Sequence, residues 1–130
     1  MGELHQDVTE AELAVLQALW DAGPATIRQL VERVYRQTGT SVYGTVQKLL
    51  ERLEAKGFVG RDRSGAVHVF RAVVNRDELI GLRLRAVADS LCGGSLTPIL
   101  THLVEGKGLS PREQQELRSL IDKLDTRRRK

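Results

Sequence analysis

The 130-residue chain has little of several residue types on which common functions depend. Its one cysteine, Cys92, can form no disulfide within the chain, and its three histidines stand in no metal-binding spacing. No apolar run approaches the roughly 20 residues of a membrane-spanning helix, and the acidic start lacks the basic-then-apolar build of a signal peptide. We therefore expect a cytoplasmic protein with no membrane insertion and no bound metal.

Catalytic signatures are also missing from the sequence. There is no nucleophile paired with a base, no pair of carboxylates suited to a cleft and no glycine-rich phosphate loop. Aromatic residues make up 4% of the chain, which leaves few side chains to line an apolar pocket. We predict no enzymatic activity and no cofactor, and a regulator that responds to a small molecule stays as an alternative.

Charge is unevenly distributed along the chain, whose net charge is +3. Residues 1–27 contain five acidic side chains and no lysine or arginine, whereas residues 28–71 contain nine basic and four acidic ones. A basic surplus on one segment is what phosphate contact requires, although mixed charges also solvate ordinary helices. Residues 28–71 are therefore the candidate nucleic-acid-binding segment, whereas the basic run at 127–130 is typical of a solvated tail.

The first part of this sequence carries the signals of two short helices. Thr9 with Glu12 and Thr26 with Gln29 form capping boxes, in which each side chain accepts a hydrogen bond from the other residue's free backbone N–H. Apolar residues then recur at helical spacing. We expect Gly39 to end the second helix, because glycine readily adopts the left-handed conformation found there.

A third helix is expected to begin after Ser41 and to end at Gly57. A glycine at that position usually turns the next residue back onto the last helical turn, which would place Phe58 against Leu53. The stripe that should face the core, at helical spacing, consists of Val42, Val46, Leu49, Leu50 and Leu53.

After this helix the apolar residues no longer recur at helical spacing. Residues 58–63 and 67–73 are rich in β-branched and apolar residues, and Ser64-Gly65 supplies a tight reversal, which predicts a β-hairpin. The sequence leaves open whether His68 and Phe70 or Val67 and Val69 point inward. Three helices followed by a hairpin are the element order of a winged helix-turn-helix, although small winged helices also serve as protein-interaction modules.

The stripe of the third helix predicts which of its residues face outward to DNA. Gln47 can pair with an adenine edge, Thr45 can meet a thymine methyl, and Lys48 can reach a guanine or a phosphate. Hairpin arginines can contact phosphates or a minor groove, and Thr26 can donate to a phosphate as well as cap its helix. The predicted DNA-binding residues are Thr26, Ser41, Tyr43, Gly44, Thr45, Gln47, Lys48, Arg52, Arg61 and Arg63.

Residues 76–130 are predicted to form three more amphipathic helices, started by Asn75, Ser95 and Ser110. Helices of this total length have too few apolar residues for a secure core of their own, so a second copy is expected to cover them. Packing on the hairpin of the same chain is the alternative. The predicted dimerisation residues are Ile80, Leu84, Val87, Leu91, Leu100, Leu103, Leu117, Leu120 and Leu124.

The fold class predicted is thus mainly α with a small β-hairpin. A winged helix-turn-helix domain would occupy residues 1–75, and a C-terminal three-helix dimerisation region would occupy residues 76–130. We further hypothesise that the protein is released from DNA when the dimer interface is weakened or when a linker at residues 73–77 is displaced. The reason is that the two winged-helix domains of a dimer would be joined only through residues 76–130.

Several motifs occur here in a characteristic order. They are the stretch from Leu13 to the Leu19-Trp20 pair, Ser41-x-x-x-Thr45-Val46, Leu53-x-x-Lys56-Gly57, the arginine-rich turn before Phe70-Arg71, and Gly93-Gly94-Ser95-Leu96. Together they resemble the penicillinase-repressor family (BlaI/MecI/CopY) over nearly the whole chain. The resemblance implies a bacterial, homodimeric winged-helix repressor that binds an inverted-repeat operator in double-stranded DNA with its third helix.

The sequence departs from this family pattern in two places. Copper-responsive relatives carry a cysteine cluster near the C-terminus, whereas this chain has only Cys92, which we interpret as a small buried apolar residue rather than a redox sensor. In β-lactam-responsive relatives a sensor-protease pathway leads to cleavage at an Asn-Phe bond, and His102-Leu103 stands at the corresponding place here. A regulatory protease is therefore an implied partner, and the bond that it would cut is left open.

Overall fold

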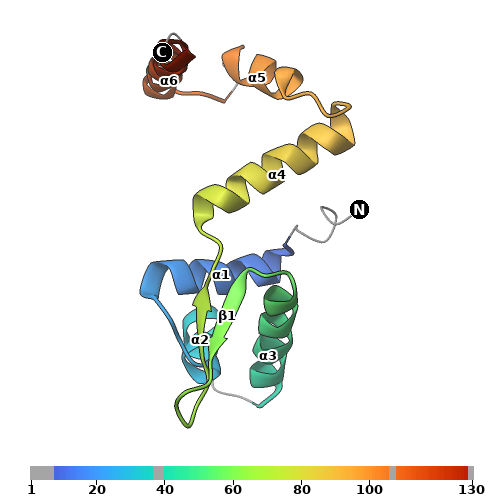
Figure 1. The fold of residues 1–130 in the computed structure, drawn as a ribbon, viewed down its shortest axis with the longest axis vertical. Helices are drawn as coiled ribbons and strands as arrows, with labels where there is room; N and C mark the ends of the chain where they lie inside the picture. The colour runs from blue at the N-terminus through green and yellow to red at the C-terminus, as the bar shows by residue number, and fades with distance from the viewer. Residues whose placement is uncertain (1–7, 37–39, 106–107, 129–130) are drawn as a thin grey trace. The chain divides into compact units, whose positions relative to one another are not determined.

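The computed structural model describes residues 8–36, 40–105 and 108–128 (Figure 1). These residues form mainly helices, with one two-stranded antiparallel hairpin after the third helix, as predicted. The chain divides into two compact units, residues 1–86 and 87–130, which are described separately. The elements in order are α1 (Glu10–Ala22), α2 (Ile27–Tyr35), α3 (Thr40–Ala55), β1 (Val59–Asp62), β2 (Val69–Ala72), α4 (Arg76–Leu91), α5 (Thr97–Val104) and α6 (Pro111–Arg128).

Both predicted capping boxes of the first two helices are present. The Thr9 hydroxyl accepts from the Glu12 N–H at 3.1 Å, and the Glu12 carboxylate accepts from the Thr9 N–H at 2.9 Å. Thr26 and Gln29 make the same exchange at 3.2 and 2.9 Å. Each box satisfies two backbone N–H groups that have no partner inside the helix, and so fixes where the helix begins.

The second helix is shorter than predicted. It ends at Tyr35, and Arg36 takes the left-handed conformation with φ 54° while its N–H donates to the Glu32 carbonyl at 3.0 Å. Gly39 lies outside the described residues, but the helix has already ended before it, so the predicted end was wrong. A long polar residue closes this helix in place of the expected glycine, at a modest conformational cost.

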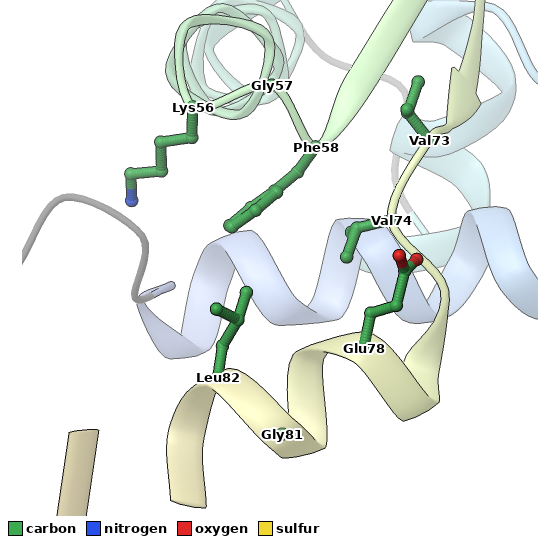
Figure 2. A pocket seen from close by; sticks show the side chains of 8 residues that line it. All are labelled: Lys56, Gly57, Phe58, Val73, Val74, Glu78, Gly81 and Leu82. Carbon is green, nitrogen blue, oxygen red and sulfur yellow. The ribbon is translucent and has the colours of Figure 1, made fainter. Parts of the chain in front are cut away.

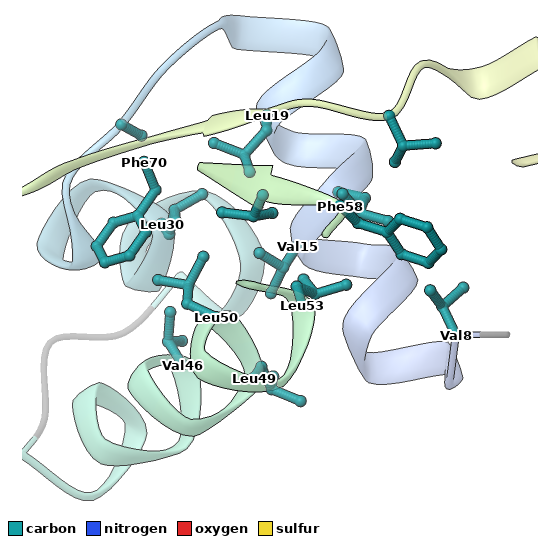
Figure 3. Close-up of a cluster of buried hydrophobic side chains, with 14 of the residues drawn as sticks. Val8, Val15, Leu19, Leu30, Val46, Leu49, Leu50, Leu53, Phe58 and Phe70 are labelled. Atoms are coloured by element: carbon teal, nitrogen blue, oxygen red, sulfur yellow. The ribbon is translucent and has the colours of Figure 1, made fainter. Parts of the chain in front are cut away.

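The end of α3 is formed as its glycine predicts. Gly57 has φ +81°, its N–H donates to the Glu54 carbonyl at 3.0 Å, and the Phe58 N–H donates to the Leu53 carbonyl at 2.9 Å. This pair of hydrogen bonds is the Schellman motif. It turns the chain back so that Phe58 and Leu53 are buried in the same cluster (Figure 3).

The hairpin loop is longer than the sequence suggested. Asp62 pairs with Val69, so residues 63–68 connect the strands, and the predicted tight reversal at Ser64-Gly65 was wrong. The Asp62 carboxylate accepts from the Ser64 N–H at 2.9 Å, a local turn with which the loop begins. The pairing of the two strands, which follows their buried positions, therefore decides where the strands end, and not the Ser64-Gly65 sequence.

Phe70 decides which face of the second strand points inward. Its side chain is 1% exposed, whereas its neighbour Arg71 is exposed. Its backbone also pairs with Ala25, since the Ala25 N–H donates to the Phe70 carbonyl at 2.9 Å and the Phe70 N–H donates back at 2.8 Å. The segment before α2 therefore extends the sheet edge and ties the hairpin to the helices.

The core of the first unit lies between α1, α2, α3 and the hairpin (Figure 3). The predicted stripe of α3 is confirmed, because Val46, Leu49, Leu50 and Leu53 are at most 5% exposed and Val42 packs partly buried against them. Burying this stripe fixes the rotation of α3 about its axis. The opposite side of the helix is therefore left to solvent.

The segment 73–77 is hydrogen-bonded to the first unit where it begins, and the hypothesis that its displacement releases DNA stays a prediction. The N–H groups of Val73 and Val74 both donate to the Phe58 carbonyl, at 2.8 and 3.2 Å. The indole N–H of Trp20 donates to the Val74 carbonyl at 2.8 Å. Three hydrogen bonds thus hold the chain immediately before α4.

The boundary between the two compact units falls within α4, between Ala86 and Val87. Leu79 is buried, and with Leu82 it packs against the core of the first unit. The first half of α4 therefore belongs structurally with the winged helix. The assignment of DNA binding to residues 1–75 and of dimerisation to residues 76–130 stays a prediction.

Of the later helices, α4 and α6 begin at their predicted caps, and α5 does not. Asn75 and Glu78 exchange hydrogen bonds of 2.9 and 2.7 Å at the start of α4, and Ser110 and Glu113 exchange bonds of 3.0 and 3.1 Å around Pro111. The start of α5 is weaker. There the Ser95 hydroxyl accepts from the Thr97 N–H at 3.2 Å, while the N-cap position itself is occupied by Leu96 and has no side-chain cap.

Candidate nucleic-acid interface

The solvent-facing side of α3 carries most of the residues predicted to contact DNA. We call this surface the α3 outer face. Its residues are exposed, except for Gly44, which is partly buried. Tyr43 lies at the flank of this face and is 39% exposed. The prediction that these residues face outward is confirmed. The α3 outer face consists of Ser41, Gly44, Thr45, Gln47, Lys48, Glu51 and Arg52.

The hydroxyl of Thr45 is already engaged within the helix. It donates to the Ser41 carbonyl at 3.1 Å, one turn earlier. The oxygen can still accept, but the proton is used, so Thr45 is suited to an apolar contact through its methyl more than to hydrogen-bond donation. Gln47 and Lys48 remain the long polar side chains at the middle of this face.

Gly44 has no structural reason within the chain to be glycine. A Cβ atom built on it meets nothing within 4 Å, and its backbone needs no positive φ. Glycine in a helix interior costs about 1 kcal/mol relative to alanine. The α3 outer face thus contains a destabilising residue at a place where the protein itself would accommodate a methyl group.

The hairpin supplies exposed cations beside α3, but not through Arg61. Arg63 in the loop and Arg71 on β2 are exposed. The side chain of Arg61 is 18% exposed, and its guanidinium donates to the Glu54 carboxylate at 2.9 Å. The prediction that Arg61 contacts DNA directly is not supported by this geometry, because its guanidinium faces the protein.

Thr26 takes the capping role described above. It is partly buried at the start of α2, where its hydroxyl accepts from the Gln29 N–H. Capping is sufficient to explain why a threonine stands at position 26. The predicted phosphate contact of Thr26 stays a prediction.

Sequence reasoning missed that several charges are used inside the first unit. Glu12 is 1% exposed, and its carboxylate accepts from Lys56 Nζ at 2.7 Å, which ties α1 to the end of α3. Arg76 lies 3.3 Å from the Asp21 carboxylate and stacks over Trp20 at 5.0 Å. The partners lie far apart in the sequence, so no local motif could have revealed them.

After these internal pairs are set aside, the segment 28–71 still presents a group of exposed cations to solvent. Phosphate contact needs such accessible guanidinium and ammonium groups. These exposed residues are Arg28, Arg33, Arg36, Lys48, Arg52, Arg63 and Arg71.

One acidic group on the hairpin stays ionised. The backbone N–H of Ser64 and then its hydroxyl donate to the Asp62 carboxylate and hold the pKa of Asp62 below its ordinary value, with a smaller contribution from the nearby Arg71 charge. Hydrogen bonds to the charged form favour it. Asp62 therefore orders the start of the loop while it remains a carboxylate.

A groove of about 500 Å³ lies in the first unit between the end of α3, residues 73–74 and the first turns of α4 (Figure 2). Phe58 points into it from one side and Leu82 from the other. Its two charged residues already have roles, because Lys56 pairs with Glu12 and Glu78 caps α4. The groove thus offers no dedicated polar group to orient a small ligand.

The residues predicted for dimerisation are mostly uncovered. Leu103 and Leu117 are partly buried, and the other predicted residues are exposed. Each compact unit therefore leaves apolar side chains in contact with water. The exposed members are Ile80, Leu84, Val87, Leu91, Leu100, Leu120 and Leu124.

The residues at 8–36, 40–105 and 108–128 show neither a metal-binding cluster nor a membrane-spanning helix. Among those residues no group of three or more His, Cys, Asp and Glu could hold a metal ion, and Cys92 is a partly buried free thiol. None of the helices described is long and apolar enough to cross a bilayer.

Comparison with known proteins identifies the family. The family model described as penicillinase repressor matches residues 8–123. The chain is 34% identical over 118 residues to the transcriptional regulator BlaI of Mycobacterium tuberculosis, covering 89% of this chain and 83% of that protein. It is 23% identical over 123 residues to the methicillin resistance regulatory protein MecI of Staphylococcus aureus, covering 95% and 99%. It is 22% identical over 122 residues to the penicillinase repressor of Bacillus licheniformis, covering 94% of each.

These matches agree with the resemblance carried by the sequence motifs, and they place the chain among regulators rather than enzymes. The chain belongs to the penicillinase repressor (BlaI/MecI) family of transcriptional repressors.

Proposed function

We propose that this protein represses transcription as a homodimer bound to an inverted-repeat operator in double-stranded DNA, with α3 in the major groove and the hairpin loop on the phosphate backbone. The observation that carries the proposal is the α3 outer face. One side of α3 is locked into the core, and the other presents small, hydrogen-bonding and cationic side chains. A helix that enters a groove about 12 Å wide needs such a surface.

Individual roles on α3 follow from side-chain chemistry. Gln47 pairs with an adenine edge, the Thr45 methyl meets a thymine methyl, and Lys48 reaches a guanine or a phosphate. Ser41 and Arg52 contact the backbone from the two ends of the same face, and Tyr43 packs on the sugar-phosphate chain from the flank. Arg63 in the hairpin loop adds a phosphate contact that fixes position without reading sequence.

The absence of a side chain at Gly44 supports close approach to DNA. The chain itself would accept a methyl group there, so the glycine is explained by an external surface that touches the helix backbone. In the proposed complex that surface is the DNA backbone.

Dimerisation is supported by the apolar residues that each compact unit leaves exposed. Burying one leucine or isoleucine side chain contributes about 1.5–3 kcal/mol, so a few such residues from each copy can drive association. A two-fold dimer presents two copies of α3 and therefore favours a palindromic site whose halves lie one or more helical turns apart.

The test is selection of a preferred duplex from a random pool by the purified full-length protein, followed by measurement of its affinity. We expect a palindromic sequence whose binding weakens steeply with salt, because several phosphates are neutralised. Lys48→Ala should weaken binding, while Lys123→Ala, which removes an exposed lysine from α6, should not. If the protein showed no preference for any duplex, this result would refute the proposal and favour the protein-interaction alternative.

A further inference from the structure

A cluster of four side chains joins α3 to both strands of the hairpin, and we call it the Arg61 cluster. Arg61 Nη2 donates to Glu54 Oε1 at 2.9 Å, and Arg61 Nη1 lies 3.2 Å from His68 Nδ1. The guanidinium carbon lies 4.7 Å from the centroid of the Phe70 ring. A single guanidinium therefore contacts two acceptors and one aromatic face.

The members of the cluster come from α3, from both strands of the hairpin and from the loop between them. Glu54 lies in the last turn of α3, and Arg61 lies on β1 directly opposite Phe70 on β2. His68 closes the loop just before β2 begins. The cluster thus links the helix proposed to read DNA with both ends of the hairpin loop.

The guanidinium is held in the protein surface and does not reach outward. Arg61 Nε is buried and has no hydrogen-bond partner among the described residues, so the group keeps its place through its two terminal nitrogens and the ring. Arginine can do this because its planar fork presents separate donors in fixed directions, which the single ammonium group of lysine cannot reproduce.

We propose that Arg61 is a positioning residue, which sets the placement of the hairpin loop against α3 and so raises operator affinity without touching DNA. Arg61 is followed by Asp62, the last residue of β1, and then by Arg63, the first residue of the loop and the cation assigned to phosphate. This inference rests on the DNA binding proposed above and assigns one part of that affinity to an internal contact.

Substitution of Glu54 distinguishes positioning from direct contact by the sign of its effect. If Arg61 bound phosphate, Glu54→Gln would free the guanidinium, remove a negative charge near DNA and tighten binding. If the ion pair positions the loop, Glu54→Gln weakens binding, as Arg61→Ala does. Glu10→Gln is the matched control, because Glu10 is an exposed glutamate in the first turn of α1 and belongs neither to the α3 outer face nor to the Arg61 cluster.

The experiment measures affinity for the duplex selected by the wild-type protein, at a temperature where thermal unfolding shows every variant to be folded. We expect Arg61→Ala and Glu54→Gln to weaken binding, on the order of tenfold, and Glu10→Gln to leave it unchanged. Arg61→Lys should not restore wild-type affinity, although a direct phosphate contact would be restored. The loss from Arg61→Ala should shrink in an Arg63→Ala background, because both act through the same loop.

Each outcome has one meaning. Tighter binding by Glu54→Gln, full rescue by Arg61→Lys, or additive losses from Arg61→Ala and Arg63→Ala would overturn the positioning role while leaving DNA binding intact. A wild-type protein that selects no duplex would instead refute the proposed function itself.

Discussion

Gly44→Ala should make the protein more stable and a weaker DNA binder at once. The new methyl group meets no protein atom within 4 Å and requires no change of backbone conformation. Replacing an interior helical glycine by alanine contributes about 1 kcal/mol, which for a folded unit of this size raises Tm by roughly 4–8 °C. The same methyl group would project from the α3 outer face into the space that the proposed complex gives to DNA.

The expected loss of DNA affinity is similar to that of one base contact, about 1–3 kcal/mol. Thermal unfolding and fluorescence anisotropy on the selected duplex measure the two effects separately. Gly81→Ala is the matched control, because Gly81 is also helical, lies on α4 and has no atom within 4 Å of a built Cβ. It should stabilise the protein by a similar amount and leave DNA affinity unchanged.

The reasoning would be refuted if Gly44→Ala raised stability and bound the duplex as tightly as the wild type. In that case the glycine would be a tolerated flaw, and DNA would not approach the α3 backbone closely. A fall in stability would contradict the structural premise instead, because it would mean that the site has no room for the methyl group.

Three further predictions concern the dimer, the buried ion pair and the loop. Leu120→Glu should shift the protein toward monomer in analytical ultracentrifugation, because Leu120 is 60% exposed in the subunit and a charge there costs little until a partner covers it; an unchanged dimer would exclude α6 from the interface. Lys56→Met should lower the free energy of unfolding by about 3 kcal/mol, since the nearly inaccessible Glu12 carboxylate loses its cation. Denaturant unfolding measures this, and a loss below about 1 kcal/mol would contradict it. Because hydrogen bonds from Ser64 depress the pKa of Asp62, the order that they give the loop should be fully present above the ordinary aspartate pKa and lost as pH falls through the depressed value. A carboxyl titration by NMR checks this, and an unshifted Asp62 would refute it.

Local sequence signals predicted the helices well because they depend on residues three to five positions apart. The capping boxes at Thr9 and Thr26, and the Schellman turn at Gly57, are formed as expected. The same is true of the α3 stripe, and hence of the direction of the α3 outer face. A candidate DNA-binding surface could therefore be placed on a helix from the sequence alone.

Contacts between distant residues could not be predicted in this way. Lys56 and Glu12 are 44 residues apart, and Trp20 and Val74 are 54 apart, so their pairing depends on how the helices pack. The sequence places Arg61 on a hairpin beside the third helix, from which an arginine can reach a phosphate or a minor groove. Only the three-dimensional position of Glu54 shows that its charge is directed inward.

The anchoring of residues 73–77 has a mechanical consequence. Hydrogen bonds to Phe58 and from the Trp20 indole, with Arg76 stacked on that indole, splint the start of α4 to the body that carries α3. The start of α4 should therefore move together with α3, so that a force applied to it would reach the proposed DNA-binding surface.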